Sequence, residues 1–329
     1  MNRHVRSHGA AILSALLLSA CAEMWGQFDN PYDRGNSNWL WTSSGVPSGL
    51  NWRGITASSD GSHLAACVSS GVGGIYTSSD GGLTWVDRPA AGDRGWTAIT
   101  SSSDGSRLAA CAATGDIYTS ADGGATWTDR SAAGLRSWGC ITSSSDGSHL
   151  AACASFGVGD IYTSVDGGAT WTDRSAAGSR FWSCIASSSD GSRLAACDFM
   201  GDVYTSPDGG ATWIDRPIPG YTGFSWIASS SDGNHLAVAS AFTWISSDGG
   251  ATWSIQTGGG LRVASSADGA ILVAFQGDRI ARSTDGGVTW NTQAGAPTSS
   301  RWQALAVSAD GGHAAACSWD GIFWIGYKP

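Results

Sequence analysis

Short runs of apolar and β-branched residues alternate along this chain with turns rich in Asp, Gly and Ser. One stretch holds four such runs in succession, at Trp96–Thr100, Arg107–Cys111, Asp116–Ser120 and Thr126–Arg130. Runs of this length, separated by Asp-Gly turns, predict short antiparallel strands joined by hairpins. The pattern therefore predicts an all-β protein in which four strands form one repeating unit.

Two motifs recur at a nearly fixed period. The first is S-x-D-G-G-x-T-W, found in six copies that contain Asp80, Asp122, Asp166, Asp208, Asp248 and Asp285. The second is a shorter S-x-D-G turn, found in seven copies that contain Asp60, Asp104, Asp146, Asp190, Asp232, Asp268 and Asp310. The shorter turns lie 36 to 44 residues apart, the length of a four-stranded propeller blade. We therefore predict seven blades in one ring.

The last unit lacks a fourth strand, and the beginning of the repeats supplies one. The final unit stops after its third run at Ile322–Ile325. Trp41 precedes Trp52 by 11 residues, the same spacing that separates a fourth-strand Trp from the next blade in other units. We predict a seven-bladed β-propeller of four-stranded antiparallel blades, closed by an N-terminal strand (38–43) that pairs with the C-terminal blade (302–326). Such closure removes an exposed sheet edge.

The first 21 residues have the features of an export signal. Arg3 and Arg6 precede an apolar run at Ala10–Ala20, which is too short to span a bilayer stably. The sequence Leu-Ser-Ala-Cys that ends at Cys21 resembles a bacterial lipobox, which implies lipidation of Cys21. The alternative is ordinary cleavage after Ala22, because the residues there also fit the small-x-small rule.

These boundaries divide the chain into three parts. Residues 1–21 are predicted to be the export or lipoprotein signal, 22–37 a polar tether, and 38–329 a single propeller. We expect an exported monomer, a lipoprotein of the cell envelope on its periplasmic or surface face and otherwise a secreted protein. It would meet a membrane only through the lipid anchor.

Composition narrows the possible partners. Charged residues make up 14% of the 329 residues, and 18 Trp and 47 Gly stand in place of the usual Lys and Glu. This composition excludes a coiled coil and a charge-rich disordered chain. The net charge of −9 argues against nucleic acid as a partner, because neutralising phosphates requires clustered Lys and Arg. Nothing in the sequence indicates a cofactor.

The S-x-D-G-G-x-T-W motif resembles the Asp-box, or BNR repeat, of bacterial-sialidase-like propellers. In that family it forms the turn between the third and fourth strands, away from the binding face, so the resemblance implies a structural role for its Asp residues. The lipobox, the length and the single ring are also similar to the photosystem II assembly factor family of thylakoid lumens. That family is associated with an Arg-rich patch, whereas the Arg residues here are scattered through the repeats.

Catalytic machinery is hard to find in the sequence. The sialidase motif F/Y-R-I-P is absent, and the only Glu is Glu23 in the tether. The four His residues of the propeller share one repeat position, which leaves no nucleophile dyad and no metal site. If the protein is an enzyme, a glycoside hydrolase or lyase would need two suitably spaced carboxylates. The candidates are Asp160, Asp198, Asp202 and Asp320.

A ligand would be expected on the face that carries the loops between second and third strands. Residues there that differ between repeats combine aromatic rings with charges, which suits sugar or peptide recognition. We predict as ligand-binding residues Phe156, Phe199, Phe242, Trp244, Arg279 and Trp319. Alternatively, these rings plug the channel mouth or shield strand ends. Arg262 departs from the repeat in a first strand, where it would contact an anion in the channel or stack on Phe275.

The eight Cys residues of an exported protein invite a disulfide interpretation. A symmetric hairpin around the S-x-D-G turn places Cys140 opposite Cys153 and Cys184 opposite Cys197. These are possible disulfides. The alternative is that all four are compact apolar residues, because directly cross-strand disulfides are geometrically awkward.

Together these features favour a non-catalytic, lipid-anchored propeller that binds a glycan, a peptide or a protein through one face. The alternatives are an Asp-dependent glycoside hydrolase or lyase of the Asp-box superfamily, and an assembly factor of a photosynthetic complex.

Overall fold

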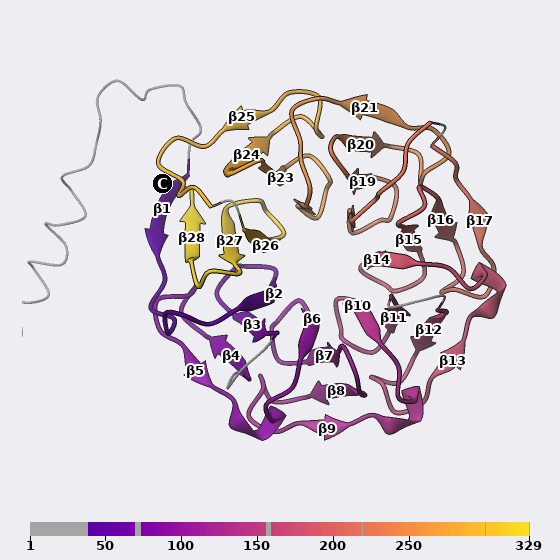
Figure 1. Ribbon diagram of the computed structural model, residues 1–329, viewed down its shortest axis with the longest axis horizontal. Coiled ribbons are helices and arrows are strands. Elements are labelled where there is room, and N and C mark those ends of the chain that lie inside the picture. The colour runs from indigo at the N-terminus through magenta and orange to yellow at the C-terminus, as the bar shows by residue number, and fades with distance from the viewer. Residues whose placement is uncertain (1–38, 70–73, 156–158, 219, 300, 329) are drawn as a thin grey trace, which may run out of the picture. The chain divides into compact units, whose positions relative to one another are not determined.

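The computed structural model describes residues 39–69, 74–155, 159–218, 220–299 and 301–328. Seven four-stranded antiparallel sheets surround a central channel, as predicted (Figure 1). The predicted signal and tether, Cys21 and Phe156 lie outside the described residues. Within the described ranges, no helix is both long and apolar enough to span a bilayer.

Each blade runs outward from the channel in chain order. Blades 1 and 2 contain β2 (Trp52–Ala57), β3 (Leu64–Val68), β4 (Ile75–Ser78), β5 (Val86–Asp87), β6 (Trp96–Ser101), β7 (Leu108–Ala112), β8 (Ile117–Ser120) and β9 (Thr128–Asp129). Blades 3 and 4 contain β10 (Trp138–Ser143), β11 (Leu150–Ala154), β12 (Ile161–Ser164), β13 (Thr172–Asp173), β14 (Trp182–Ser187), β15 (Leu194–Asp198), β16 (Val203–Ser206) and β17 (Ile214–Asp215).

The remaining three blades follow the same plan with more variation in sequence. Blades 5 and 6 contain β18 (Trp226–Ser229), β19 (Leu236–Ala239), β20 (Thr243–Ser246), β21 (Ser254–Gln256), β22 (Val263–Ser265), β23 (Leu272–Gln276), β24 (Arg279–Ser283) and β25 (Asn291–Thr292). Blade 7 contains β26 (Trp302–Val307), β27 (His313–Ser318), β28 (Phe323–Tyr327) and β1 (Leu40–Ser43). Short 3-10 turns at Pro89–Ala91, Ser131–Ala133 and Ser175–Ala177 follow blades 1 to 3.

The ring closes between the two ends of the repeat region, as predicted. Strand β1 pairs antiparallel with β28, with Trp41 opposite Gly326 and Ser43 opposite Trp324 (Figure 1). Just before β1, Trp39 is buried, and its backbone N–H donates to Gln293 Oε1 at 3.1 Å. The closing strand is thus held by its own sheet and by a side chain that follows blade 6.

The S-x-D-G-G-x-T-W motifs join the third and fourth strands, where the Asp-box resemblance placed them. In blade 2, Asp122 accepts hydrogen bonds from Ser120 Oγ and Thr126 N, both at 2.8 Å. Gly124 has φ of 88°, a left-handed conformation that favours glycine, and Trp127 Nε1 donates to its carbonyl oxygen at 3.0 Å. These hydrogen bonds hold the pKa of Asp122 at about 2. The Asp carboxylate therefore serves the turn.

The shorter S-x-D-G turns also join the blades to one another. At the x position of each turn, the backbone N–H donates to the carbonyl oxygen of the same position in the next blade. The bonds are 2.7–2.8 Å long and pass through Ser59, Ser103, Ser145, Ser189, Ser231, Ala267 and Ala309 back to Ser59. These residues form a closed ring of seven backbone hydrogen bonds, which we call the turn ring.

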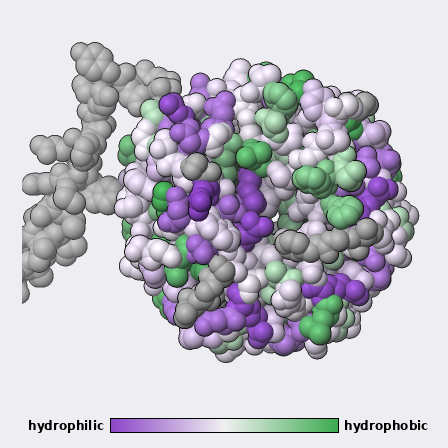
Figure 2. All heavy atoms as spheres, in the orientation of Figure 1, coloured by the Kyte–Doolittle hydropathy of each residue, from purple (hydrophilic) through white to green (hydrophobic). Residues whose placement is uncertain are grey.

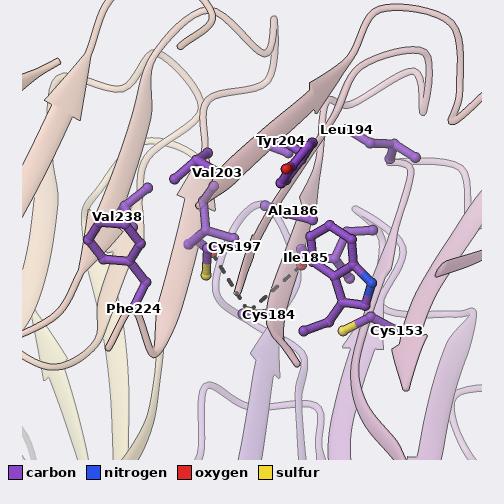
Figure 3. Close-up of a cluster of buried hydrophobic side chains, with 14 of the residues drawn as sticks. Cys153, Cys184, Ile185, Ala186, Leu194, Cys197, Val203, Tyr204, Phe224 and Val238 are labelled. Atoms are coloured by element: carbon purple, nitrogen blue, oxygen red, sulfur yellow. Dashed lines mark hydrogen bonds between the residues drawn. The ribbon is translucent and has the colours of Figure 1, made fainter. Parts of the chain in front are cut away.

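The core lies between neighbouring blades. Second strands such as β7 are buried along their whole length and rich in Ala, which lets adjacent sheets approach closely. In blades 1 to 4, a fully buried first-strand Trp packs edge-on against the third-strand Tyr, as Trp96 does with Tyr118 at 5.5 Å. Figure 3 shows the continuation of this core around Cys184, Tyr204 and Phe224.

Candidate functional site

The two ends of the propeller differ in chemistry. One end carries all the Asp turns, whose side chains are occupied by local hydrogen bonds. The other end, which we call the loop face, carries the loops between second and third strands and the connections to the next blade. Among the residues that the structure describes, the predicted ligand contacts from the second-to-third-strand segments are Phe199, Phe242, Trp244, Arg279 and Trp319. The geometry of this end decides what they could bind.

Three Arg–Tyr stacks line the loop face in blades 2 to 4. The guanidinium carbons lie 4.1–4.3 Å from the ring centroids in the pairs Arg94–Tyr118, Arg136–Tyr162 and Arg180–Tyr204. Burial, followed by a hydrogen bond to Asp173, raises the pKa of Tyr162 to about 12, so this phenol stays neutral and donates. Each Arg stands two residues before its inner-strand Trp. This R-x-W spacing is visible in the sequence, but it was not predicted to mark a site.

Arg180 organises a charged cluster in blade 4. Its Nη1 lies 3.4 Å from Asp202 Oδ2 and 3.8 Å from Asp198 Oδ2. Asp198 is buried and also accepts the backbone N–H groups of Gly201 and Asp202 at 2.9 and 3.0 Å. Burial and the charge of Asp198 raise the pKa of Asp202. Asp198, a predicted catalytic candidate, therefore lies inside a turn and is not open to a substrate.

The other two predicted catalytic carboxylates are also tied to neighbouring hydroxyl groups. Asp160 in blade 3 accepts a hydrogen bond from Ser179 Oγ, and Asp320 in blade 7 accepts one from Ser318 Oγ. Of the four predicted catalytic carboxylates, only Asp198 and Asp202 lie together, and both lie beside the guanidinium of Arg180. In the described part of the chain, no three His, Cys, Asp or Glu side chains gather as a metal site would require.

The predicted aromatic residues separate into exposed and buried groups. Phe199 is 63% exposed and Phe242 37% exposed, as expected for a contact surface. Trp244 was predicted as a ligand contact but is buried, because the ring of Tyr221 covers it at 4.4 Å. Arg279 is exposed on blade 6, where its Nε lies 3.9 Å from Asp278 Oδ1, and Trp319 is half-buried on blade 7.

Exposed apolar side chains of the loop face gather on one side of it. They are Leu135, Phe181, Phe199, Met200, Phe242 and Leu261, each between 37% and 78% exposed, and we call them the apolar arc. The arc belongs to the loops and connections of blades 3 to 6. Figure 2 shows apolar surface gathered over blades 4 and 5, to the right of the central opening. Leu135, Phe181 and Leu261 were not predicted from the sequence, whereas Met200 belongs to a loop that was expected on this face.

Backbone hydrogen bonds join the middle of the arc. Phe199 N donates to Phe181 O at 3.0 Å, and Gly223 N donates to Phe199 O at 2.8 Å. The tip of the blade 4 loop is thus fastened to the connections on both sides of it. The arc is therefore a supported surface and not a set of independent loops.

Arg262 stacks on Trp226, a residue that lines the central channel. Its guanidinium carbon lies 4.5 Å from the Trp226 ring centroid, whereas Phe275 stacks on Trp302 at 5.1 Å. The predicted stack on Phe275 is therefore replaced by one on Trp226. Burial, followed by the charge of Arg53, lowers the pKa of Arg262 to about 10, so the side chain keeps its charge at neutral pH.

The predicted cysteine pairs lie opposite one another without an S–S bond. The strand registers place Cys140 opposite Cys153 and Cys184 opposite Cys197, as expected. All four side chains are free, buried thiols. The sulfur that approaches Cys140 is that of Cys184 in the next blade, at 3.0 Å. The hairpin symmetry correctly gave the register, but side-chain direction brings a different pair of sulfur atoms together.

Comparison with known proteins identifies the fold and no family. Neither a family model nor a curated protein matches this chain. Among solved structures, YCF48 from Cyanidioschyzon merolae superposes with a TM-score of 0.65 at 17% identity, covering 88% of this chain and 98% of that one. A structure described as YCF48 bound to D1 peptide gives a TM-score of 0.66 at 18% identity, covering 90% of this chain and 98% of that one.

An enzyme shares the fold as well. The GH74 xyloglucanase from Xanthomonas campestris superposes with a TM-score of 0.64 at 18% identity. The match covers 87% of this chain but 53% of the xyloglucanase, so this chain spans about half of that enzyme's length. Proteins of different activity thus share this architecture, and the side chains of the loop face must decide the function.

Proposed function

We propose that this protein is an exported, lipid-anchored propeller without catalytic activity that binds a segment of another protein on its loop face. The observation that carries the proposal is the apolar arc over blades 3 to 6. Phe199 and Met200 are 63% and 62% exposed at the tip of the blade 4 loop. Exposed apolar side chains gathered on one side of a face are typical of an interaction site.

The chemistry of the arc favours a protein segment over a glycan. A sugar site needs carboxylates free to accept hydroxyl protons beside the aromatic ring. Next to Phe199, however, Asp198 accepts two backbone N–H groups and lies near Arg180, which also holds Asp202. Flexible Met and flat Phe side chains, in contrast, adapt well to the apolar side chains of a peptide.

The same contacts count against the glycosidase alternative. Its acid and base would have to come from Asp160, Asp198, Asp202 and Asp320, of which Asp198 is buried and Asp160 and Asp320 are bonded to Ser hydroxyls. A propeller described as bound to D1 peptide has a similar fold. That likeness supports the proposal as an example of peptide binding on this architecture.

The binding proposal is tested with a charge placed in the arc. Full-length protein and its Phe199→Asp variant would be used to capture partners from solubilised cell envelopes, and synthetic peptides from a captured protein would then be titrated. We expect Phe199→Asp to weaken peptide binding at least about tenfold, because binding would bury the new carboxylate against apolar groups. Leu83→Asp is the matched control, since Leu83 is 61% exposed on an Asp turn at the opposite end.

Two results would overturn the proposal. Equal binding by Phe199→Asp and wild type would remove the arc from the site. Release of reducing sugars from a β-glucan, abolished by Asp202→Asn, would establish the hydrolase instead. Recovery of photosystem subunits as the captured partner would favour the assembly-factor alternative within the binding proposal.

The location of the protein is a separate part of the proposal. The basic start, the apolar run and the lipobox-like sequence at Cys21 support export and lipid attachment. Mass spectrometry of the mature N-terminus should find a diacylglyceryl thioether on Cys21. A Cys21→Ser variant should appear in the soluble fraction. An unmodified N-terminus that begins after Ala22 would replace the anchor with ordinary secretion.

A further inference from the structure

Two thiols of neighbouring blades face one another at the wall of the central channel. Cys140 lies on β10 and Cys184 on β14, the inner strands of blades 3 and 4, with their sulfur atoms 3.0 Å apart. This separation is about 1 Å longer than the S–S bond of a disulfide. Both residues line a cavity of about 270 Å³ whose walls come from the inner strands of all seven blades. Both side chains are buried, at 3% and 2% exposure, so an oxidant must approach the sulfur atoms from this cavity.

The two thiols are electrostatically unequal. A hydrogen bond from Cys184, helped by the charge of Arg262, lowers the pKa of the Cys140 thiol. Burial, followed by that same hydrogen bond, raises the pKa of Cys184. These opposite directions assign Cys140 as the attacking thiol of the pair. A pair with one nucleophilic thiolate and one protonated partner is the arrangement that thiol–disulfide exchange requires.

The other described cysteines have a different environment. Cys67, Cys111, Cys153, Cys197 and Cys317 lie on the fully buried second strands, and none of them lines the channel cavity. Burial raises the pKa of Cys67 and Cys317 to about 12, which keeps both thiols protonated. These residues fill space as compact apolar side chains. Thiol–disulfide exchange is therefore expected only at the inner-strand pair, Cys140 and Cys184.

We propose that Cys140 and Cys184 are a redox-active dithiol that closes to a disulfide between blades 3 and 4. The oxidant is a disulfide, either a small molecule or an oxidised protein dithiol. The Cys140 thiolate attacks one sulfur of the oxidant, forming a mixed disulfide and releasing one thiolate. The Cys184 thiol then gives its proton to the released thiolate and attacks Cys140 Sγ, which releases the second thiolate. Two protein thiols and one disulfide thus become one protein disulfide and two small thiols.

Peptide mapping distinguishes this bond from the two cross-strand pairs. The full chain would be incubated with oxidised glutathione, alkylated and digested with trypsin without reduction. We expect peptide 137–174 linked to peptide 181–193, with release by reductant. A loop within 137–174, a link between 181–193 and 194–262, or complete alkylation after the oxidant would each overturn the proposal.

Single substitutions assign the sulfur atoms. Because peptide 137–174 also contains Cys153, Cys140→Ser should abolish the linked peptide and Cys153→Ser should retain it. The reverse result would overturn the assignment. Oxidised wild type should also melt several degrees above reduced wild type, because the bond constrains the unfolded chain over a sequence separation of 44 residues.

Arg262 stacks on Trp226, which lines the same cavity as Cys140 and Cys184, and its variant has a specific readout. Arg262→Gln should shift the pH dependence of the oxidation rate to higher pH, because the Cys140 thiolate loses a nearby positive charge. Arg262→Lys should restore much of the original profile. An unchanged profile in Arg262→Gln would overturn the assigned role of the guanidinium.

Discussion

The turn ring makes a quantitative prediction about how the blades are held together. Ser103 N donates to Ser145 O at 2.7 Å, linking the turns of blades 2 and 3. Ser103 is also the second residue of a four-residue turn closed by the bond from Gly105 N to Ser102 O at 3.0 Å. Proline is favoured at this position, so Ser103→Pro removes the inter-blade donor while keeping the turn.

The expected cost follows from the groups involved. Ser103 and Ser145 are exposed, so water can replace the lost donor and the missing hydrogen bond costs about 0.5–1.5 kcal/mol. Reduced entropy of the unfolded chain offsets about 0.4–1 kcal/mol of this when proline is introduced. Ser103→Pro should therefore be about 0.5–1.5 kcal/mol less stable than a proline variant that keeps its hydrogen bonds, measured by urea unfolding followed through Trp fluorescence.

A matched proline variant separates the lost hydrogen bond from a general effect of proline. In the S-x-D-G-G-x-T-W turn of blade 4, Pro207 naturally stands at the position that Ala121 has in blade 2. Ala121→Pro should thus leave the free energy of unfolding nearly unchanged. If Ser103→Pro and Ala121→Pro unfold at the same urea concentration as wild type, the turn ring contributes nothing measurable and the reasoning is refuted.

Three further predictions concern the core and the turns. Trp138→Ala should lower the free energy of unfolding by about 3–5 kcal/mol in a urea titration, because Trp138 is fully buried. Leu135→Ala, at an exposed site, should lower it little. Equal losses of stability in the two variants would contradict the packing. Hydrogen bonds from Ser102 and Ser106 lower the pKa of Asp104 to about 2, so its stabilisation is complete above pH 3.8 and is lost as the pH falls towards 2. Asp104→Asn should reduce the difference in melting temperature between pH 5 and pH 2, and an unchanged difference would contradict this. Gly124→Ala should destabilise the protein by more than about 1 kcal/mol in the same titration, since the new Cβ would lie 3.2 Å from Thr77 Cγ2. Gly220 also has a positive φ but no neighbour within 4 Å, so Gly220→Ala measures the cost of the backbone conformation alone.

The architecture was predictable because its signals are local and repeated. An Asp-Gly turn specifies a hairpin within a few residues, and seven such turns at a nearly constant spacing specify seven blades. Ring closure followed from one missing strand and one surplus strand, so the pairing of β1 with β28 was also expected. The structural role predicted for the Asp residues of the turns agrees with the structure for the same reason, because each Asp accepts hydrogen bonds from donors in its own turn.

The candidate site was predictable only in part. Phe199 and Phe242 are exposed on the loop face as expected, but Trp244 is covered by Tyr221 from the connection that precedes its blade. The R-x-W spacing of Arg94, Arg136 and Arg180 was visible in the sequence, but its partner Tyr lies more than 20 residues away in each case. Residue type indicated the chemistry of these positions without indicating which side chain would be covered.

Sequence alone therefore determined the strand number, the turn chemistry and the order of the blades, because each depends on neighbours in the chain. Only the tertiary structure decided the contacts between blades: the turn ring, the approach of Cys140 to Cys184 and the position of Arg262 over Trp226. These contacts depend on the twist of each sheet and the direction of each side chain when two sheets meet. The repeat pattern does not encode that geometry in any single blade.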